Sequence, residues 1–117
     1  MQMNEMSFDK ALPVDGYGPG FFRVGGKAVS GPMCISGGRS RGWGGYDDVD
    51  TLLGLAGSVD VLFVGTGGET AHIPPALRAT LEGAGLGVEV MNSPAACRTY
   101  NVLLSEGRRV ALAVLPV

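Results

Sequence analysis

The sequence predicts a single three-layer α/β domain, with a central mixed β-sheet flanked by helices and an amino-terminal β-hairpin portion. Short strand-like runs separated by glycine turns occupy the beginning of the chain. From about residue 47 onward, helical and strand-like segments alternate, which is typical of a sheet with parallel strands. The 117 residues fit one domain of common size. We therefore assign residues 13–117 to one α/β domain and residues 1–12 to a loose amino-terminal lead-in.

The amino-terminal part predicts short strands separated by turns. The predicted strands are Phe21–Val24, Lys27–Ser30 and Pro32–Ser36. In the last of these, Met33 and Ile35 should share one face because strand side chains alternate. Gly25-Gly26 is the two-residue link expected of a tight hairpin. Asp15–Gly20 is rich in turn residues and is expected to be a turn. Gly37–Gly45 is expected to be a long loop of glycine, arginine and serine.

The carboxyl-terminal part predicts helices and strands in alternation. The predicted helices begin at Asp47 or Asp48, at Pro74-Pro75 and at Ser93-Pro94, and end near Gly57, Gly85 and Glu106. The predicted strands are Val59–Val64, Val88–Met91 and Arg109–Val117. The first of these strands is apolar apart from Asp60, so we expect a central position covered on both faces. In the last helix, the Ser93 hydroxyl is expected to cap the amino terminus.

The overall charge disfavours nucleic-acid binding. The formal net charge is −2 at pH 7, whereas a nucleic-acid-binding face is basic. Arg39-Ser-Arg41, followed by Trp43, comes nearest to such a face, because two arginines and an aromatic ring can contact a phosphate or a base. A solvated loop is the favoured interpretation there. We therefore expect no nucleic-acid partner.

The cysteines and apolar runs predict a soluble cytoplasmic protein. Cys34 and Cys97 lie in hydrophobic surroundings, which favours buried free thiols in a reducing compartment, although sequence separation alone leaves a disulfide open. Residues 1–10 contain no apolar run of signal-peptide length. The apolar run Val61–Val64 is far too short to form a transmembrane segment.

Gly65–His72 is the first candidate site. A glycine-rich loop at the carboxyl end of a central strand is where open α/β sheets bind ligands, and free N–H groups at the next helix start favour an anion. The dinucleotide fingerprint is incomplete, because Thr70 replaces its third glycine. A plain turn without a ligand is the simpler interpretation. His72, the single histidine, could act as an acid, a base or a polar contact. One histidine and two distant cysteines predict neither a metal nor another cofactor.

The start of the last helix is the second candidate site. Arg98, Thr99 and Asn101 interrupt an otherwise apolar helix, and the Arg98 guanidinium could hold an anion. The helix dipole could lower the pKa of the Cys97 thiol, but a small buried thiol is favoured. No catalytic constellation can be recognised from spacing, because such side chains meet only in space.

Several stretches together carry a family resemblance. They are Gly16–Val24, the Trp43 loop, Val61–Gly67, Pro75–Arg78 and Met91–Arg108 with the apolar strand after it. These stretches resemble a small-protein family without assigned enzymatic activity, which includes bacterial and archaeal single-domain proteins and an assembly factor of mitochondrial respiratory complex I. The resemblance implies a three-layer α/β domain and a role in protein interaction and complex assembly. It singles out Gly65, Thr66, Gly67, Arg98, Thr99 and Asn101. The chain departs from the family pattern at Asn92 and Ser93, where an acidic residue and a threonine are more usual.

The leading functional hypothesis is a non-catalytic protein-interaction or assembly module, with respiratory-complex subunits as candidate partners. The alternative is a small-ligand or anion-binding protein, or a weak enzyme, that uses Gly65–His72 and the start of the last helix. The residues favour the absence of catalysis without deciding it. Tyr17, Phe21 and Phe22 are a candidate apolar patch for a homodimer, although such residues more often belong to the core.

Overall fold

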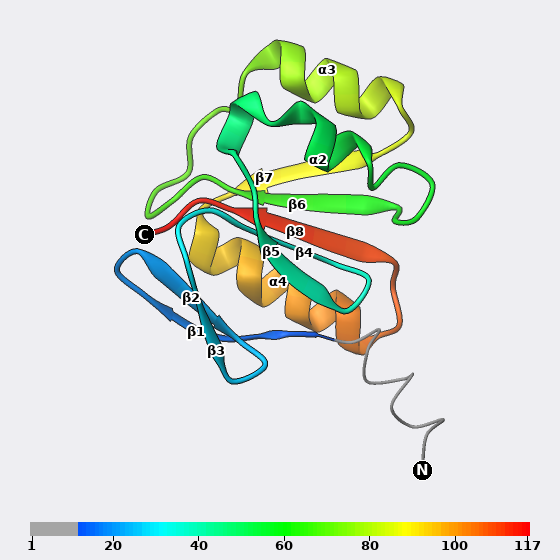
Figure 1. The fold of residues 1–117 in the computed structure, drawn as a ribbon. Helices are drawn as coiled ribbons and strands as arrows, with labels where there is room; N and C mark the ends of the chain where they lie inside the picture. The colour runs from blue at the N-terminus through cyan, green and yellow to red at the C-terminus, as the bar shows by residue number, and fades with distance from the viewer. Residues whose placement is uncertain (1–11) are drawn as a thin grey trace.

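The computed structural model describes residues 12–117, so the predicted lead-in at residues 1–12 lies, apart from Leu12, outside the described residues. The strands are β1 (Val14–Gly18), β2 (Phe21–Val24), β3 (Lys27–Ser30), β4 (Met33–Ser36), β5 (Arg39–Gly42), β6 (Val61–Gly65), β7 (Gly87–Met91) and β8 (Val110–Val114). The helices are the short 3-10 turn η1 (Gly45–Asp47) and the α-helices α2 (Val49–Leu53), α3 (Pro75–Gly83) and α4 (Ser93–Ser105). These elements form one mixed α/β domain with two sheets, as the sequence predicts (Figure 1).

Strand β8 lies at the centre of the larger sheet, whose strand order is β5-β4-β8-β6-β7. It runs parallel to β6 and antiparallel to β4, so that Leu112 has Phe63 on one side and Ile35 on the other. Every residue of β8 is buried, because both faces of the sheet are covered. A separate antiparallel sheet has the order β1-β2-β3.

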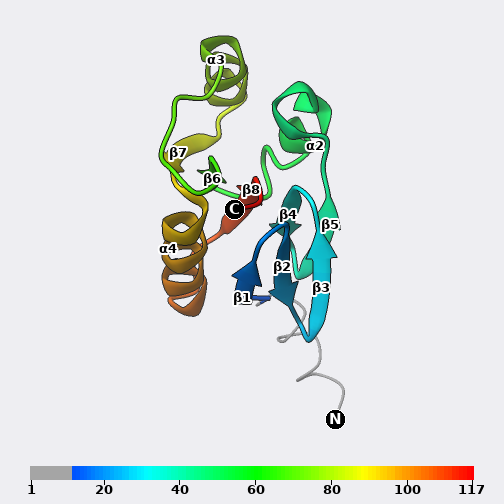
Figure 2. The same cartoon turned by 90° about the vertical axis from the view of Figure 1, so that its left-hand side faces the viewer.

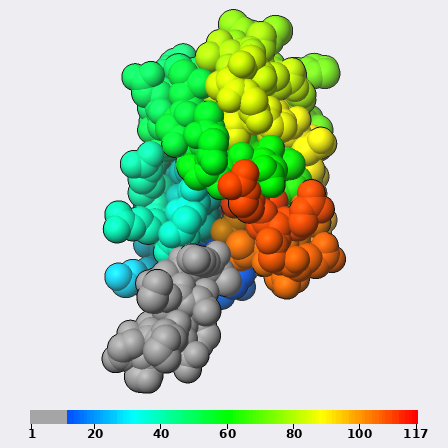
Figure 3. All heavy atoms as spheres, turned by 90° about the vertical axis from the view of Figure 1, so that its right-hand side faces the viewer, coloured from blue at the N-terminus to red at the C-terminus, as the bar shows by residue number. Residues whose placement is uncertain are grey.

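The five-stranded sheet is the middle layer of three. Helices α2 and α3 cover one face, whereas α4 and the three-stranded sheet cover the other (Figures 1 and 2). The core under α2 and α3 includes Leu52, Leu62, Leu77, Leu81 and Ala111. The core under α4 includes Phe22, Met33, Ile35, Tyr100 and Leu112, so Met33 and Ile35 share a face as predicted. Figure 3 shows the end of α4 and the start of β8, in orange, beside the cyan amino-terminal strands and below α2 and α3.

Two glycine pairs build the hairpins. Gly25 and Gly26 join β2 to β3 with φ of +59° and +80°, which is the mirror-image turn that fits the twist of paired strands. The predicted hairpin is therefore confirmed. Gly37 and Gly38, with φ of +60° and +79°, join β4 to β5 in the same way. The predicted loop at Gly37–Gly45 is wrong over Arg39–Gly42, because the polar side chains of this edge strand lack the apolar alternation that marks a strand in sequence.

The expected turn at Asp15–Gly20 is also wrong in part, because β1 continues to Gly18. Its pairing with β2 places Tyr17 opposite Phe22, and the register shifts between Val14 and Gly16. A glycine-containing irregularity of this kind bends an edge strand without ending it. Phe22 is fully buried whereas Tyr17 is 47% exposed, so the candidate homodimer residues Tyr17, Phe21 and Phe22 do not form one exposed apolar patch.

Side chains that accept backbone N–H bonds begin two of the helices. Asp48 caps α2 as predicted, since its Oδ1 accepts a bond from the Thr51 N–H at 3.3 Å. The helix ends at Leu53 rather than near Gly57, because Gly54 already occupies its carboxyl-terminal cap. At α4 the predicted Ser93 cap is wrong. Asn92 is the cap, and its Oδ1 accepts a bond of 2.8 Å from the Ala95 N–H.

Candidate functional site

The two candidate segments meet at one edge of the five-stranded sheet, where the parallel strands β6, β7 and β8 end. The Thr66 N–H donates to the Met91 carbonyl at 2.9 Å, and the Ser93 N–H donates to the Gly67 carbonyl at 2.7 Å. The loop after β6 is therefore fastened directly to the start of α4. We call this contact region, formed by residues 65–67, 91–93 and 115, the strand-end junction.

Ser93 occupies the centre of the strand-end junction. Its side chain is completely buried, and its Oγ donates to the Leu115 carbonyl at 2.6 Å and accepts from the Gly67 N–H at 2.9 Å. One hydroxyl thus satisfies a donor and an acceptor that lie far apart in sequence. The sequence predicts only a capping role for Ser93, because the contact with Leu115 depends on the folded sheet.

Gly65 allows α4 to approach the end of β6. A Cβ added at this position would lie 2.6 Å from Val114 Cγ1, 2.7 Å from Ser93 Oγ and 2.8 Å from Ser93 Cα. Contacts this short do not occur between packed carbon atoms, so the neighbouring backbone would have to move. The glycine here serves close packing.

Thr66 folds the loop after β6 back on itself. Its Oγ1 donates to the Glu69 carbonyl at 2.6 Å and accepts from the Ala71 N–H at 3.1 Å. Residues 68–72 are exposed beyond this turn, and they include His72. Gly65, Thr66 and Gly67 therefore hold the loop in place, whereas residues 68–72 present it to solvent.

The strand-end junction offers an anion neither space nor a free donor at Gly67. The Gly67 N–H that an anion would need already binds Ser93 Oγ, and the buried Ser93 side chain fills the gap between loop and helix. The ligand-binding alternative requires the loop after β6 and the start of α4 to lie together, and they do. The buried Ser93 side chain, however, fills the pocket that a ligand would need there.

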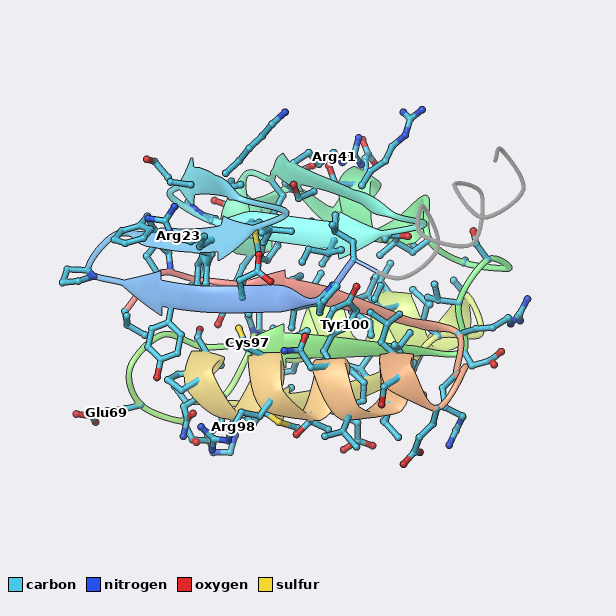
Figure 4. The ribbon with its side chains drawn as sticks, turned by 90° about the horizontal axis from the view of Figure 1, so that it is seen from below. Arg23, Arg41, Glu69, Cys97, Arg98 and Tyr100 are labelled. Carbon is cyan, nitrogen blue, oxygen red and sulfur yellow. The ribbon has the colours of Figure 1, made fainter. Side chains whose placement is uncertain are left out.

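Asn101 anchors strand β1 to α4. Its Nδ2 donates to the Val14 carbonyl at 2.9 Å, and its Oδ1 accepts from the Val14 N–H at 2.8 Å, so the side-chain amide pairs with the strand as another strand would. One residue earlier, the Tyr100 hydroxyl donates to the Leu12 carbonyl at 2.9 Å from a ring that faces the sheet (Figure 4). Asn101 thus holds β1 in place against α4.

Arg98 points away from all of these contacts. It is exposed on α4, and Figure 4 shows its side chain projecting from the helix on the side opposite the sheet. Val102, four residues later on the same helix face, is 55% exposed, which is unusual for a large apolar side chain in this chain. Thr99 is half-buried and its Oγ1 lies 3.6 Å from Met91 Sδ. Val102 is not among the residues that the sequence predicts for this site, although its position four residues after Arg98 places it on the polar face of the helix.

Comparison with known proteins agrees with this architecture. A family model described as a protein of unknown function (DUF498/DUF598) matches residues 14–115. The chain belongs to this family. The family resemblance predicted from the sequence is therefore confirmed.

Members and relatives of the family differ in how they are named. An uncharacterised protein of Rhodobacter capsulatus is 48% identical over all of this chain and 94% of its own length. The NADH dehydrogenase (ubiquinone) 1 alpha subcomplex assembly factor 3 of Bos taurus is 31% identical over 91% of this chain, which spans only 61% of the bovine protein. The solved structure of a Bartonella henselae protein described as an outer membrane protein has a TM-score of 0.83 at 31% identity and covers 92% of this chain and 97% of its own.

Two kinds of feature, a membrane-spanning helix and a group of metal ligands, are absent from the part of the chain that the structure describes. Over residues 12–117, no helix is both long and apolar enough to cross a membrane. In the same residues, no three or more histidine, cysteine or acidic side chains gather into a group that could hold a metal ion.

The two cysteines are free and lie on opposite faces of the sheet. Cys34 belongs to the core under α2 and α3, whereas Cys97 belongs to the core under α4. Burial raises the pKa of each thiol to about 11, and the nearby charges of Arg41 and Arg98 offset this only partly. The helix dipole therefore does not make Cys97 a thiolate at neutral pH, and the favoured prediction of buried free thiols is confirmed.

Three surface hollows lie away from the strand-end junction. The first, about 320 Å³, is lined by Cys34, Ser36, Arg39, Ser40, Arg41 and Leu55. The second, about 510 Å³, lies between the β4–β5 turn and the end of α4, beside Arg108. The third, about 320 Å³, lies between η1 and α3 and is lined by Tyr46 and Pro74 among others. None of these three includes the Gly65–Gly67 segment or Arg98.

Proposed function

We propose that this protein is a non-catalytic interaction module that assists the assembly of a multisubunit protein complex, with respiratory-complex subunits as its candidate partners. The observation that carries the proposal is that some candidate residues make internal contacts whereas others are exposed. Internal hydrogen bonds and close packing occupy Gly65, Thr66 and Gly67, whereas Arg98 is exposed beside the apolar Val102.

An exposed arginine next to an exposed aliphatic side chain suits a protein interface. Arginine is enriched at interfaces because its planar guanidinium binds carboxylates in a fixed geometry while its stem packs on apolar surface. Val102 supplies apolar area on the same helix face, and His72 lies in the exposed loop that the strand-end junction holds beside the start of α4. We name the exposed residues 68–72, Arg98 and Val102 the α4 face.

The remaining candidate residues fix the shape of this face. Thr66 sets the conformation of the loop, and Asn101 with Thr99 fixes α4 against β1 and β7. A surface held by internal hydrogen bonds loses little conformational freedom on binding, which favours affinity. The name of the bovine relative, an assembly factor for a respiratory-complex subcomplex, supports the class of partner.

Co-purification tests the proposal. Tagged wild-type protein should recover a partner from cell extract in mild detergent, and Arg98→Ala combined with Val102→Asn should reduce that recovery at least about tenfold, as expected for residues at the centre of an interface. Arg23→Ala is the matched control, because Arg23 is equally a surface arginine but lies on β2. Recovery of no partner, or equal recovery with both variants, would contradict the proposal.

A further inference from the structure

Strand β5 forms a free edge of the five-stranded sheet, and its arginines form an unusual feature of that edge. Among residues 12–117, β5 pairs only with β4, so half of its backbone N–H and C=O groups point away from the sheet. β3 lies near β5 but belongs to the other sheet, where it pairs with β2 (Figure 2). An edge of this kind can accept an additional strand.

Arg39 and Arg41 lie on the same side of this edge. They stand directly opposite Ser36 and Cys34 of β4, and directly opposite residues of paired strands share a face. Together with Leu55 these side chains line the hollow of about 320 Å³. Its floor is therefore apolar, from Cys34 and Leu55, and its rim carries two guanidinium groups (Figure 4 labels Arg41).

Neither guanidinium is neutralised by a direct partner within residues 12–117. The ion pairs of this part of the chain join Arg78 to Glu82 and Arg109 to Asp60. The Asp48 carboxylate lies near enough to Arg41 for their charges to interact, but it already accepts bonds from the Gly44 and Thr51 N–H groups and the Thr51 hydroxyl. The rim keeps an excess of positive charge in a chain whose formal net charge is −2.

We propose that the edge of β5 binds an extended acidic segment of a partner protein, which adds a strand beside Arg39–Gly42 and places two carboxylates opposite Arg39 and Arg41. Because strand side chains alternate, the two acidic residues must be separated by one residue. A second copy of this chain is a poor occupant, since pairing β5 with β5 would bring like charges together. This surface is separate from the α4 face. It deepens the proposed interaction function and rests on it, but its test needs no natural partner.

Titration of the full chain with short peptides, followed by amide NMR spectra, tests the proposal. The probe is Ac-TEVEVT-NH2, and the control Ac-TEEVVT-NH2 has the same composition with its acidic residues adjacent. We expect the probe to shift the amide signals of Ser40 and Gly42 and to bind about fivefold more tightly than the control, since only the probe offers two cross-strand charge pairs on one face. Added salt should weaken the binding.

Charge-reversed variants complete the test. Arg39→Glu combined with Arg41→Glu should abolish the shifts, whereas Arg108→Glu, an exposed arginine elsewhere, should leave them unchanged. Absence of shifts at β5 would overturn the proposal. So would equal binding of the two peptides, or the same shifts with free glutamate or inorganic phosphate, because these results describe an anion hollow and not a strand-binding edge. Co-purification that depends on Arg98 while the peptides fail would leave the proposed function standing and reject this surface alone.

Discussion

The buried hydroxyl of Ser93 donates a hydrogen bond of 2.6 Å to the carbonyl of Leu115, across 22 positions of sequence. The same oxygen accepts from the Gly67 N–H at 2.9 Å. Ser93 therefore joins the ends of β6 and β8 to the start of α4. This junction positions the loop at residues 68–72 beside α4, and the α4 face depends on it.

Replacing Ser93 with alanine should destabilise the protein. Ser93→Ala leaves the Gly67 N–H and the Leu115 carbonyl without a partner in a buried place, which costs about 1–3 kcal/mol per unsatisfied group. Urea unfolding should show a loss of free energy in that range or above. Ser105→Ala is the control, because the exposed Ser105 hydroxyl contacts only the Val102 carbonyl of its own helix, and it should change stability by less than about 0.5 kcal/mol. A Ser93→Ala variant as stable as the control would contradict this role.

Gly65→Ala tests the close approach of α4 to β6. The added methyl group would lie 2.8 Å from a backbone atom, Ser93 Cα, so strain of about 1–3 kcal/mol or more is expected in thermal or urea unfolding. Gly68→Ala is a matched control in the same loop, since a Cβ there meets no atom within 4 Å. Equal stability of the two variants would show that the junction relaxes easily.

Asn101→Leu should loosen strand β1. The variant loses both bonds to Val14, leaving that backbone N–H and C=O unpaired, at a cost of about 1–3 kcal/mol. Hydrogen exchange at the Val14 amide should accelerate at least about tenfold while amides of the central strand β8 change less. Tyr100→Phe, which removes only the bond to Leu12, should give a smaller effect. Unchanged exchange at Val14 in the Asn101 variant would contradict an anchoring role.

The buried thiols make stability depend on alkaline pH. Burial raises the pKa of Cys34 and Cys97 from 9.0 to about 11, so the folded state favours the protonated thiols. This contribution is complete below pH 9 and is lost as the pH rises through 11. The free energy of unfolding should therefore fall between pH 9 and 11 more steeply in the wild type than in a variant carrying Cys34→Ala and Cys97→Ala. Parallel pH curves for the two proteins would refute the assignment.

Much of the fold follows from local patterns. The glycine pair between β2 and β3, the apolar run of β6 and the prolines at the helix starts each specify their element without reference to distant residues. The sequence of β5 does not specify a strand in this way, because Arg39 and Arg41 lie on an exposed face of an edge strand. This strand forms through its pairing with β4.

The position of the candidate site could be predicted from the sequence, but the contacts that its residues make could not. The position of Gly65–Gly67 beside the start of α4 follows from the rule that parallel strands end at one edge. That Ser93 fills this place, and that Asn101 binds Val14, 87 positions away, depends on tertiary contacts that spacing does not encode. Arg98 and Val102 are what these contacts leave exposed on the helix.

The most direct test of an interaction function at the α4 face is photo-crosslinking in living cells. Benzoylphenylalanine placed at Val102 or at Arg98 should give a crosslinked species of higher mass that contains a second protein, whereas the same group at Arg23 on β2 should give none. Arg98→Glu in the Val102 crosslinking variant should remove the product. Absence of a product at both α4 positions, or equal products at Arg23, would contradict the central claim.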